Sequence, residues 1–184
     1  MLPTITVVLS CIACLQVGQA ATHQKANTTW CQQAECQGDT QMWKDILLAI
    51  EERPCDSREY LLEQKAKSHN AVIGKLVDVL LSSVHCEHGI KELAIPEPVL
   101  VFSPPIPATV GRRRMEMVVA TLEVVVTREG FVSDAKIVKW VSGSPKYGRE
   151  IVSHAKGLLF VPATLNGRFV AHSFRLNLRI NVGP

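Results

Sequence analysis

The chain has 184 residues, of which 47% are hydrophobic and 20% are charged, and its formal net charge at pH 7 is +3. This composition fits one ordinary globular domain or two small ones and excludes a disordered chain. The charge is uneven, because residues 21–110 hold 8 basic and 12 acidic residues whereas residues 111–184 hold 12 basic and 5 acidic residues. A basic half of this kind attracts nucleic acid, anionic lipid or an acidic protein surface.

The first 20 residues have the pattern of a secretory signal peptide. They contain no Asp, Glu, Lys or Arg, and an almost wholly apolar run over 5–17 precedes the small-residue pattern Gly18-Gln19-Ala20. We therefore predict cleavage after Ala20. The alternatives are an uncleaved anchor, although the apolar run is shorter than the roughly 20 residues of a spanning helix, and a lipoprotein signal at Cys11 or Cys14. Because an exported chain rarely meets nucleic acid, we expect an acidic protein to be the partner of the basic half.

Residues 21–94 hold four cysteines, which are Cys31, Cys36, Cys55 and Cys86. In an exported protein an even number of cysteines predicts structural disulfides, here two. The sequence leaves all three pairings open.

The periodicity of residues 38–88 predicts three short helices. Pro54 ends the first helix, Asp56 and Glu59 resemble a capping box at the start of the second, and Gly89 is the predicted end of the third. The apolar stripes of the first and third helices consist of Met42, Trp43, Ile46, Leu47 and Ile50, and of Val72, Ile73, Leu76, Val77, Leu80, Leu81 and Val84. Since such short helices bury little surface unaided, disulfides would stabilise this region.

Five prolines between residues 95 and 107 mark the end of the predicted helical region. This density excludes a helix and favours extended, polyproline-like chain. Residues 95–110 are therefore predicted to be a linker between the disulfide-stapled helical region, residues 21–94, and a second domain, residues 111–184.

Beyond the prolines the pattern becomes that of strands. Alternating apolar residues over 118–126 predict one strand, and Arg128-Glu129-Gly130 predicts a turn into a second strand over 131–141. A helix then carries Tyr147, Ile151, Ala155 and Leu158 and stops before Pro162.

Asn166-Gly167 is predicted to turn the chain into a long final strand, Arg168–Val182. Its apolar side chains face one way, while Ser173, Arg175, Asn177, Arg179 and Asn181 face the other. The order strand, strand, helix, strand predicts an α+β fold in which an antiparallel three-stranded sheet packs one face on the helix.

Several short motifs in residues 106–183 follow the order and spacing found in the TonB C-terminal domain family. They are Ile106-Pro107, Arg112-Arg113-Arg114-Met115-Glu116-Met117-Val118, Gly130-Phe131-Val132-Ser133-Asp134, Ser142-Gly143-Ser144-Pro145, and Phe160-Val161-Pro162-Ala163 followed by Gly167. The chain resembles a divergent member of this family. The departures are Ile106 for the usual Tyr, Arg114 and Met117 for glycines, Gly148 for an Asp and Leu158 for a Trp.

The resemblance implies a protein-binding module that takes up the extended TonB box of an outer-membrane transporter, or a segment of another envelope protein, beside its last strand. An edge strand accepts such a chain because its backbone N–H and C=O groups are unpaired. The side chains expected to contact the partner are Arg168, Ser173, Arg175, Asn177 and Arg179. The alternative is that the last strand lies inside the sheet with its polar face in water.

The resemblance places the chain in a Gram-negative envelope, periplasmic or secreted, with a role in TonB-dependent transmembrane transport. A homodimer is an alternative partner, whereas nucleic acid, small-molecule substrates and cofactors are not expected. With an uncleaved N-terminus the chain would instead be a TonB-type energy transducer anchored in the inner membrane.

A disulfide-rich enzyme or metal-binding protein is the third hypothesis. The candidate metal cluster His85-Cys86-Glu87-His88 matches no standard zinc spacing, and the four residues between Cys31 and Cys36 differ from the Cys-x-x-Cys spacing of redox enzymes. No motif places a serine, cysteine or carboxylate beside His154 or His172. We therefore expect no metal ligands and no catalytic residues.

Overall fold

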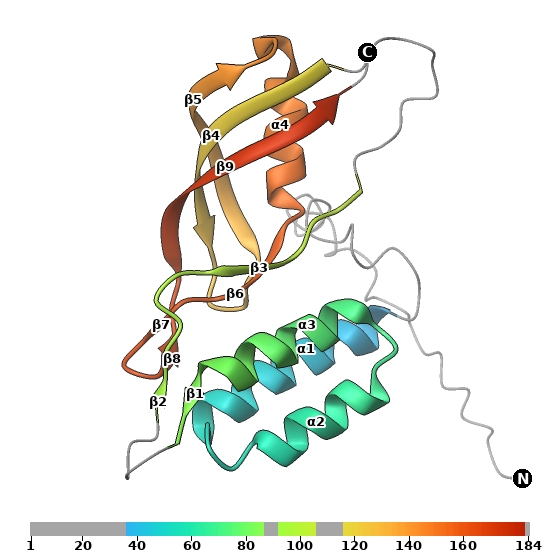
Figure 1. Cartoon of the computed structure of the whole chain (residues 1–184), viewed down its shortest axis with the longest axis vertical. Helices are drawn as coiled ribbons and strands as arrows, with labels where there is room; N and C mark the ends of the chain where they lie inside the picture. Colours follow the sequence, from blue (N-terminus) through green and yellow to red (C-terminus); the bar gives the residue numbers. More distant parts are fainter. Residues whose placement is uncertain (1–35, 87–91, 106–115, 183–184) are drawn as a thin grey trace, which may run out of the picture.

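The computed structural model describes residues 36–86, 92–105 and 116–182, and within them the fold class is α+β, as predicted. In this described part of the chain, four α-helices accompany several antiparallel sheets (Figure 1). The predicted signal peptide, residues 1–20, lies outside the described residues. None of the helices in the described residues is long and apolar enough to cross a membrane.

The three predicted helices of the N-terminal half are confirmed as α1 (Cys36–Glu52), α2 (Arg58–Lys67) and α3 (Ala71–Ser83). The predicted capping box at Asp56 and Glu59 is wrong, because Ser57 occupies the N-cap position of α2 and makes no side-chain cap. Its hydroxyl oxygen lies 2.7 Å from the carbonyl oxygen of Ala49 and 2.6 Å from that of Arg53. Ser57 therefore fixes the turn between α1 and α2.

The end of the third helix also differs from the prediction. Asn70 caps α3 by accepting a hydrogen bond from the N–H of Val72 at 2.9 Å. The helix ends at Ser83, because Val84 already belongs to β1 (Val84–His85), which pairs with β2 (Glu92–Leu93). Gly89, the predicted helix end, lies outside the described residues.

The proline-rich stretch contains a strand, β3 (Val99–Phe102), which pairs antiparallel with β6 (Leu159–Val161). The flanking Pro98 and Pro104 are buried. Over residues 99–102 the chain is therefore built into the fold rather than running as a free spacer, while the predicted domain limits stay predictions. Periodicity missed both strands because each is short and their pairing spans about 60 residues of chain.

The helices pack against the β3–β6 pair and form the first of the two hydrophobic cores found among the described residues. This core includes Trp43, Ile46, Ile50, Leu61, Ile73, Leu76 and Leu80 from the helices, with Val101, Leu159 and Val161 from the strands. Figure 1 shows the three helices grouped at one end of the molecule, with β3 and β6 between them and the larger sheet.

The second core lies under a three-stranded antiparallel sheet of β4 (Glu116–Val126), β5 (Val132–Ser142) and β9 (His172–Val182). A short 3-10 turn, η1 (Pro145–Tyr147), leads into α4 (Gly148–Lys156), which packs on one face of this sheet and mainly against β5. The predicted three-stranded antiparallel sheet with a helix on one face is therefore present, although further short strands, among them β6, lie between α4 and β9 in the chain. The alternation on β4 is also confirmed, since Val118, Ala120, Leu122, Val124 and Val126 are all buried.

The predicted final strand, Arg168–Val182, is divided in two. Asn166 and Gly167, at φ 53° and 73°, form the turn of a small hairpin between β7 (Thr164–Leu165) and β8 (Arg168–Phe169). The N–H of Val170 then bonds to the carbonyl oxygen of Ala163 at 2.9 Å, and β9 begins only at His172. The prediction of one continuous strand from Arg168 is therefore wrong at its start.

Candidate protein-binding edge of the sheet

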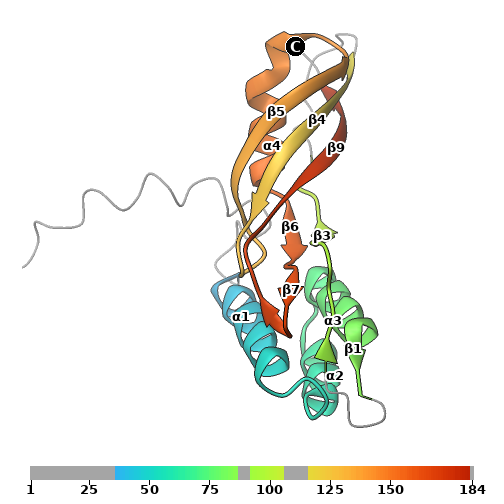
Figure 2. The same cartoon turned by 90° about the vertical axis from the view of Figure 1, so that its left-hand side faces the viewer.

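The last strand lies at an edge of the three-stranded sheet. The strand order is β5-β4-β9, and β9 pairs with β4 over its whole length, from Glu116 opposite Val182 to Val126 opposite His172. Within the described residues β9 forms no ladder on its other side. Figure 2 shows β9 on the outside of the sheet, with α4 beside β5. The alternative of an inner strand therefore does not apply to this part of the chain.

The turn between β4 and β5 fixes which backbone groups of β9 face outward. Thr127 donates its N–H to the carbonyl oxygen of Phe131 at 2.7 Å, so odd-numbered residues of β4 direct their backbone groups toward β5. Even-numbered residues direct theirs toward β9, and the unbroken register pairs even with even, as in Val124 with Phe174. The odd-numbered residues 173–181 therefore direct their N–H and C=O groups to the free edge.

The same odd-numbered residues carry the polar side chains that the sequence singled out. Ser173, Arg175, Asn177 and Arg179 are exposed on the open face of the sheet, whereas the even-numbered side chains pack toward α4. The structure brings these four predicted residues together on one strand. It does not bring Arg168 to them, because Arg168 lies on β8 in a separate hairpin.

Two side-chain contacts tie the polar row of β9 to β4. The hydroxyl of Thr121 lies 2.8 Å from the amide oxygen of Asn177, and Nε of Arg179 lies 2.8 Å from the sulfur of Met117. Arg175 stands directly opposite Glu123 in the register. In the described part of the chain neither arginine forms an ion pair.

Strand β5 adds charged residues to the open face that sequence reasoning did not include in the site. Lys136 lies opposite Glu123, and Lys139 lies opposite Thr121. Alternation alone predicts which side of a strand a residue occupies, but the register between strands is needed to place these lysines beside Glu123 and Thr121. The open face thus combines Lys136, Lys139, Arg175 and Arg179 with Glu123 and Asp134.

The opposite edge of the sheet, β5, is irregular. Its pairing with β4 shifts register at three places, whereas the pairing of β9 with β4 runs through 11 residue pairs without a shift. The shifts add residues on β5, because Val126 pairs with Val132 whereas Val119 pairs with Ser142. Such bulges bend and twist a strand and protect its edge from pairing with other chains. The regular edge of the sheet is therefore that of β9.

The cysteine prediction is tested for one pair. Cys55 and Cys86 form a disulfide, with their Cα atoms 5.8 Å apart. Cys31 and the side chain of Cys36 lie outside the described residues. The disulfide removes the thiol of Cys86 from the candidate metal cluster, whose Glu87 and His88 also lie outside the described part of the chain.

His154 and His172 each lie against a neighbouring side chain. His154 on α4 is half-buried, and its Nε2 lies 3.3 Å from the hydroxyl oxygen of Ser103. Burial lowers the pKa of His154 below its ordinary value of 6.5. His172, at the start of β9, lies beside the ring of Phe174 with ring centroids 6.5 Å apart. The described residues place no carboxylate in contact with the His154 ring, so the Ser103–His154 contact lacks the third group of a catalytic triad.

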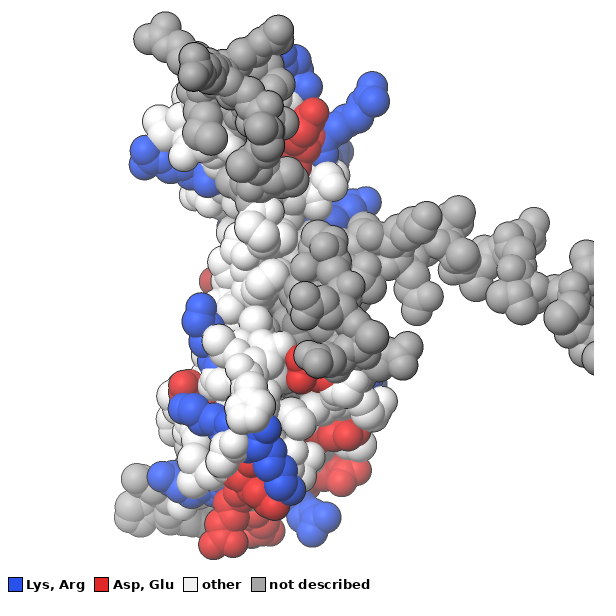
Figure 3. Space-filling model, turned by 90° about the vertical axis from the view of Figure 1, so that its right-hand side faces the viewer, with Lys and Arg blue, Asp and Glu red and all other residues white. Residues whose placement is uncertain are grey.

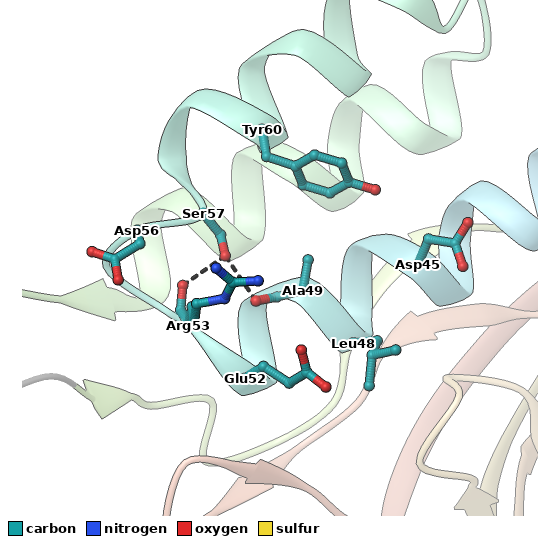
Figure 4. A pocket seen from close by; sticks show the side chains of 8 residues that line it. All are labelled: Asp45, Leu48, Ala49, Glu52, Arg53, Asp56, Ser57 and Tyr60. Atoms are coloured by element: carbon teal, nitrogen blue, oxygen red, sulfur yellow. Dashed lines mark hydrogen bonds between the residues drawn. The ribbon is translucent and has the colours of Figure 1, made fainter.

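An open hollow of about 350 Å³ lies between α1 and α2 (Figure 4). Its rim carries the carboxylates of Asp45, Glu52 and Asp56, together with Tyr60. Ser57, the hydroxyl group nearest the turn, is engaged with backbone carbonyls as described above. The hollow therefore presents three acidic side chains together with the basic side chain of Arg53. On the face of the molecule drawn in Figure 3, most acidic side chains lie toward the helical end.

Comparison with known proteins identifies no matching family model, no similar curated protein and no similar solved structure. A function for this chain therefore rests on its sequence motifs and on the geometry of its described residues.

Proposed function

We propose that the chain is a protein-binding module that takes up an extended segment of another envelope protein as an additional strand beside β9. The observation that carries this proposal is the regular edge of β9, along which no other strand of the described residues pairs. Unpaired backbone groups on such an edge form a template for an incoming chain, and each pair of hydrogen bonds adds to its affinity.

The composition of β9 suits this role. It contains no proline, so each of its odd-numbered residues keeps the N–H that an incoming strand requires. Its even-numbered apolar side chains pack in the core with α4, which holds the strand against β4. The edge is therefore organised before a partner arrives, and this lowers the entropy that binding costs.

The partner class follows from the resemblance to the TonB C-terminal family. On that basis the bound segment is the TonB box of an outer-membrane transporter or a similar segment of another envelope protein, and the place of action is the periplasm of a Gram-negative cell. The order of strand, strand, helix and strand, with the last strand beside the first, supports this assignment. A role in TonB-dependent transport belongs to the same proposal.

The experiment is a titration of the isotope-labelled protein with TonB-box peptides, followed by NMR. We expect shift changes and slowed amide exchange at the odd-numbered residues of β9, because those N–H groups face the free edge. A matched peptide series carries N-methyl groups on alternate amides. Methylation of the peptide amides that face β9 should abolish binding. Methylation of the amides that face away from β9 should not, since only alternate backbone groups of an added strand face β9.

Binding that leaves the amides of β9 unchanged, or equal loss of affinity with both methylated sets, would contradict strand addition. The absence of binding by every TonB-box peptide and every outer-membrane receptor offered would contradict the proposed partner class.

A further inference from the structure

We infer that the segment bound beside β9 carries acidic side chains at two positions four residues apart, one opposite Arg175 and one opposite Arg179. This inference rests on the proposed strand addition and names the chemistry of the partner. It follows from the position of the two arginines on the free strand and from the charges that surround them.

The geometry places both arginines beside any added strand. Arg175 and Arg179 are exposed on the same face of β9, four residues or about 13 Å apart at the rise of a strand. A neighbouring strand would lie about 4.8 Å away, and its residues opposite the two arginines would also be four apart and on the same face. This holds for a parallel and for an antiparallel partner.

The charge of the open face favours carboxylates at those positions. Within the described residues the open face holds four basic side chains, Lys136, Lys139, Arg175 and Arg179, and two acidic ones, Glu123 and Asp134. None of these four basic side chains forms an ion pair with another described residue. The lysines lie on β5, two strands from the free edge, so they contribute to the long-range potential rather than to direct contacts.

The two arginines are not equivalent. Arg175 stands opposite Glu123, which can compete with the carboxylate of a partner, whereas Arg179 stands opposite the apolar Val119. The contact from Nε of Arg179 to the sulfur of Met117 holds its guanidinium on the open face, and its terminal nitrogens bond to no other described residue. Arg179 should therefore contribute more to recognition than Arg175.

The test uses one extended host peptide in three forms, measured by calorimetry at low salt. The first has Glu at two positions four apart, the second has Glu at two positions three apart, and the third has Ala at the same positions. The second peptide has the charge of the first but places its carboxylates on opposite faces of the strand. We expect the first to bind about 3- to 30-fold more tightly than the other two, with the difference shrinking at high salt.

Charge reversal provides the complementary arm. The double variant Arg175→Glu with Arg179→Glu should prefer a peptide with Lys at the two positions four apart. Of the single variants, Arg179→Ala should lose more of the preference for the acidic peptide than Arg175→Ala. Lys136→Ala is the matched control, because it removes a cation of the same face without touching the edge, and the preference should persist.

The outcomes separate this inference from the proposed function. Equal affinity for all three peptides, with NMR shift changes on β9, would overturn the acidic pattern and leave strand addition standing. The failure of all three to bind at β9 would overturn strand addition itself. A third outcome is that the protein binds anionic lipid vesicles, that the charge-reversed double variant does not, and that the protein binds the three peptides equally. This outcome would identify a lipid-binding face and overturn the inference.

Discussion

The indole N–H of Trp43 donates a hydrogen bond to the backbone carbonyl oxygen of Glu129 at 2.8 Å. This contact joins α1 to the turn of the β4–β5 hairpin, 86 residues further along the chain. The Trp43 side chain is fully buried, and the exposed Arg128 pairs with Glu51 nearby at 3.3 Å. The helical region is thus attached directly to the sheet that carries the proposed binding edge.

Trp43→Phe should lower the free energy of unfolding by about 1–3 kcal/mol, because it leaves the carbonyl of Glu129 without its donor. Trp43→Ala should cost about 3–5 kcal/mol through the cavity it creates. Arg128→Ala is the control and should change stability by about 1 kcal/mol or less, since the Arg128 side chain is 60% exposed. Denaturant unfolding measures all three. A Trp43→Ala variant as stable as Arg128→Ala would show that α1 is not attached in this way.

Gly130 and Gly167 form a matched pair for substitution by alanine. Both have positive φ, at 88° and 73°, but a Cβ at Gly130 would lie 2.0 Å from the carbonyl oxygen of Phe160, whereas a Cβ at Gly167 would meet nothing within 4 Å. Gly167→Ala should therefore cost about 1–2 kcal/mol, from backbone conformation alone. Gly130→Ala should cost clearly more, because the carbonyl it displaces belongs to β6. Equal shifts in melting temperature would refute the close approach of these two segments.

The Cys55–Cys86 disulfide closes a loop with a sequence separation of 31. Replacing both residues by serine should lower the free energy of unfolding by about 3–4 kcal/mol through the larger entropy of the unfolded chain. Peptide mapping under non-reducing conditions should yield a Cys55–Cys86 cross-linked fragment. Because Cys55 and Cys86 are joined, the second disulfide predicted for residues 21–94 would join Cys31 to Cys36. A fragment joining Cys55 to Cys31 would contradict the structure.

His154 should make the protein less stable in mild acid. Its pKa in the folded protein lies below the ordinary value of 6.5, so the unfolded chain takes up its proton first as the pH falls. His154 therefore leaves the free energy of unfolding unchanged above about pH 6.5 and lowers it below that pH. His154→Gln should narrow the difference in unfolding free energy between about pH 7 and pH 5. An identical pH profile for the variant and the natural chain would show that His154 does not titrate abnormally.

The strongly periodic elements of this fold could be predicted from the sequence, and the short paired ones could not. The alternation of β4 and β9 and the apolar stripes of α1 and α3 depend on side chains within one segment, so each element carries its own signal. Strands β3 and β6 have four and three residues, and their pairing joins distant parts of the chain. No local pattern encodes such a contact.

The candidate site was predictable to a similar extent. Alternation placed Ser173, Arg175, Asn177 and Arg179 on one face, and the structure keeps them there. Arg168 is separated from them because it belongs to the β7–β8 hairpin, which the hydrogen bond from Val170 to Ala163 extends by one pair. The sequence predicted the Asn166-Gly167 turn of this hairpin but not that its second strand ends before β9. The position of β9 at the edge is a property of the strand order, and this also lies beyond local patterns.

The most direct measurement of the central claim compares the affinity of a TonB-box peptide for Arg175→Pro and for Arg175→Ala. The N–H of Arg175 faces the free edge, so proline should remove a bond to the partner while the β4–β9 ladder and the melting temperature stay nearly unchanged. Strand addition predicts that Arg175→Pro loses peptide binding about tenfold or more relative to Arg175→Ala, which keeps the N–H. Equal affinity of the two folded variants would contradict it.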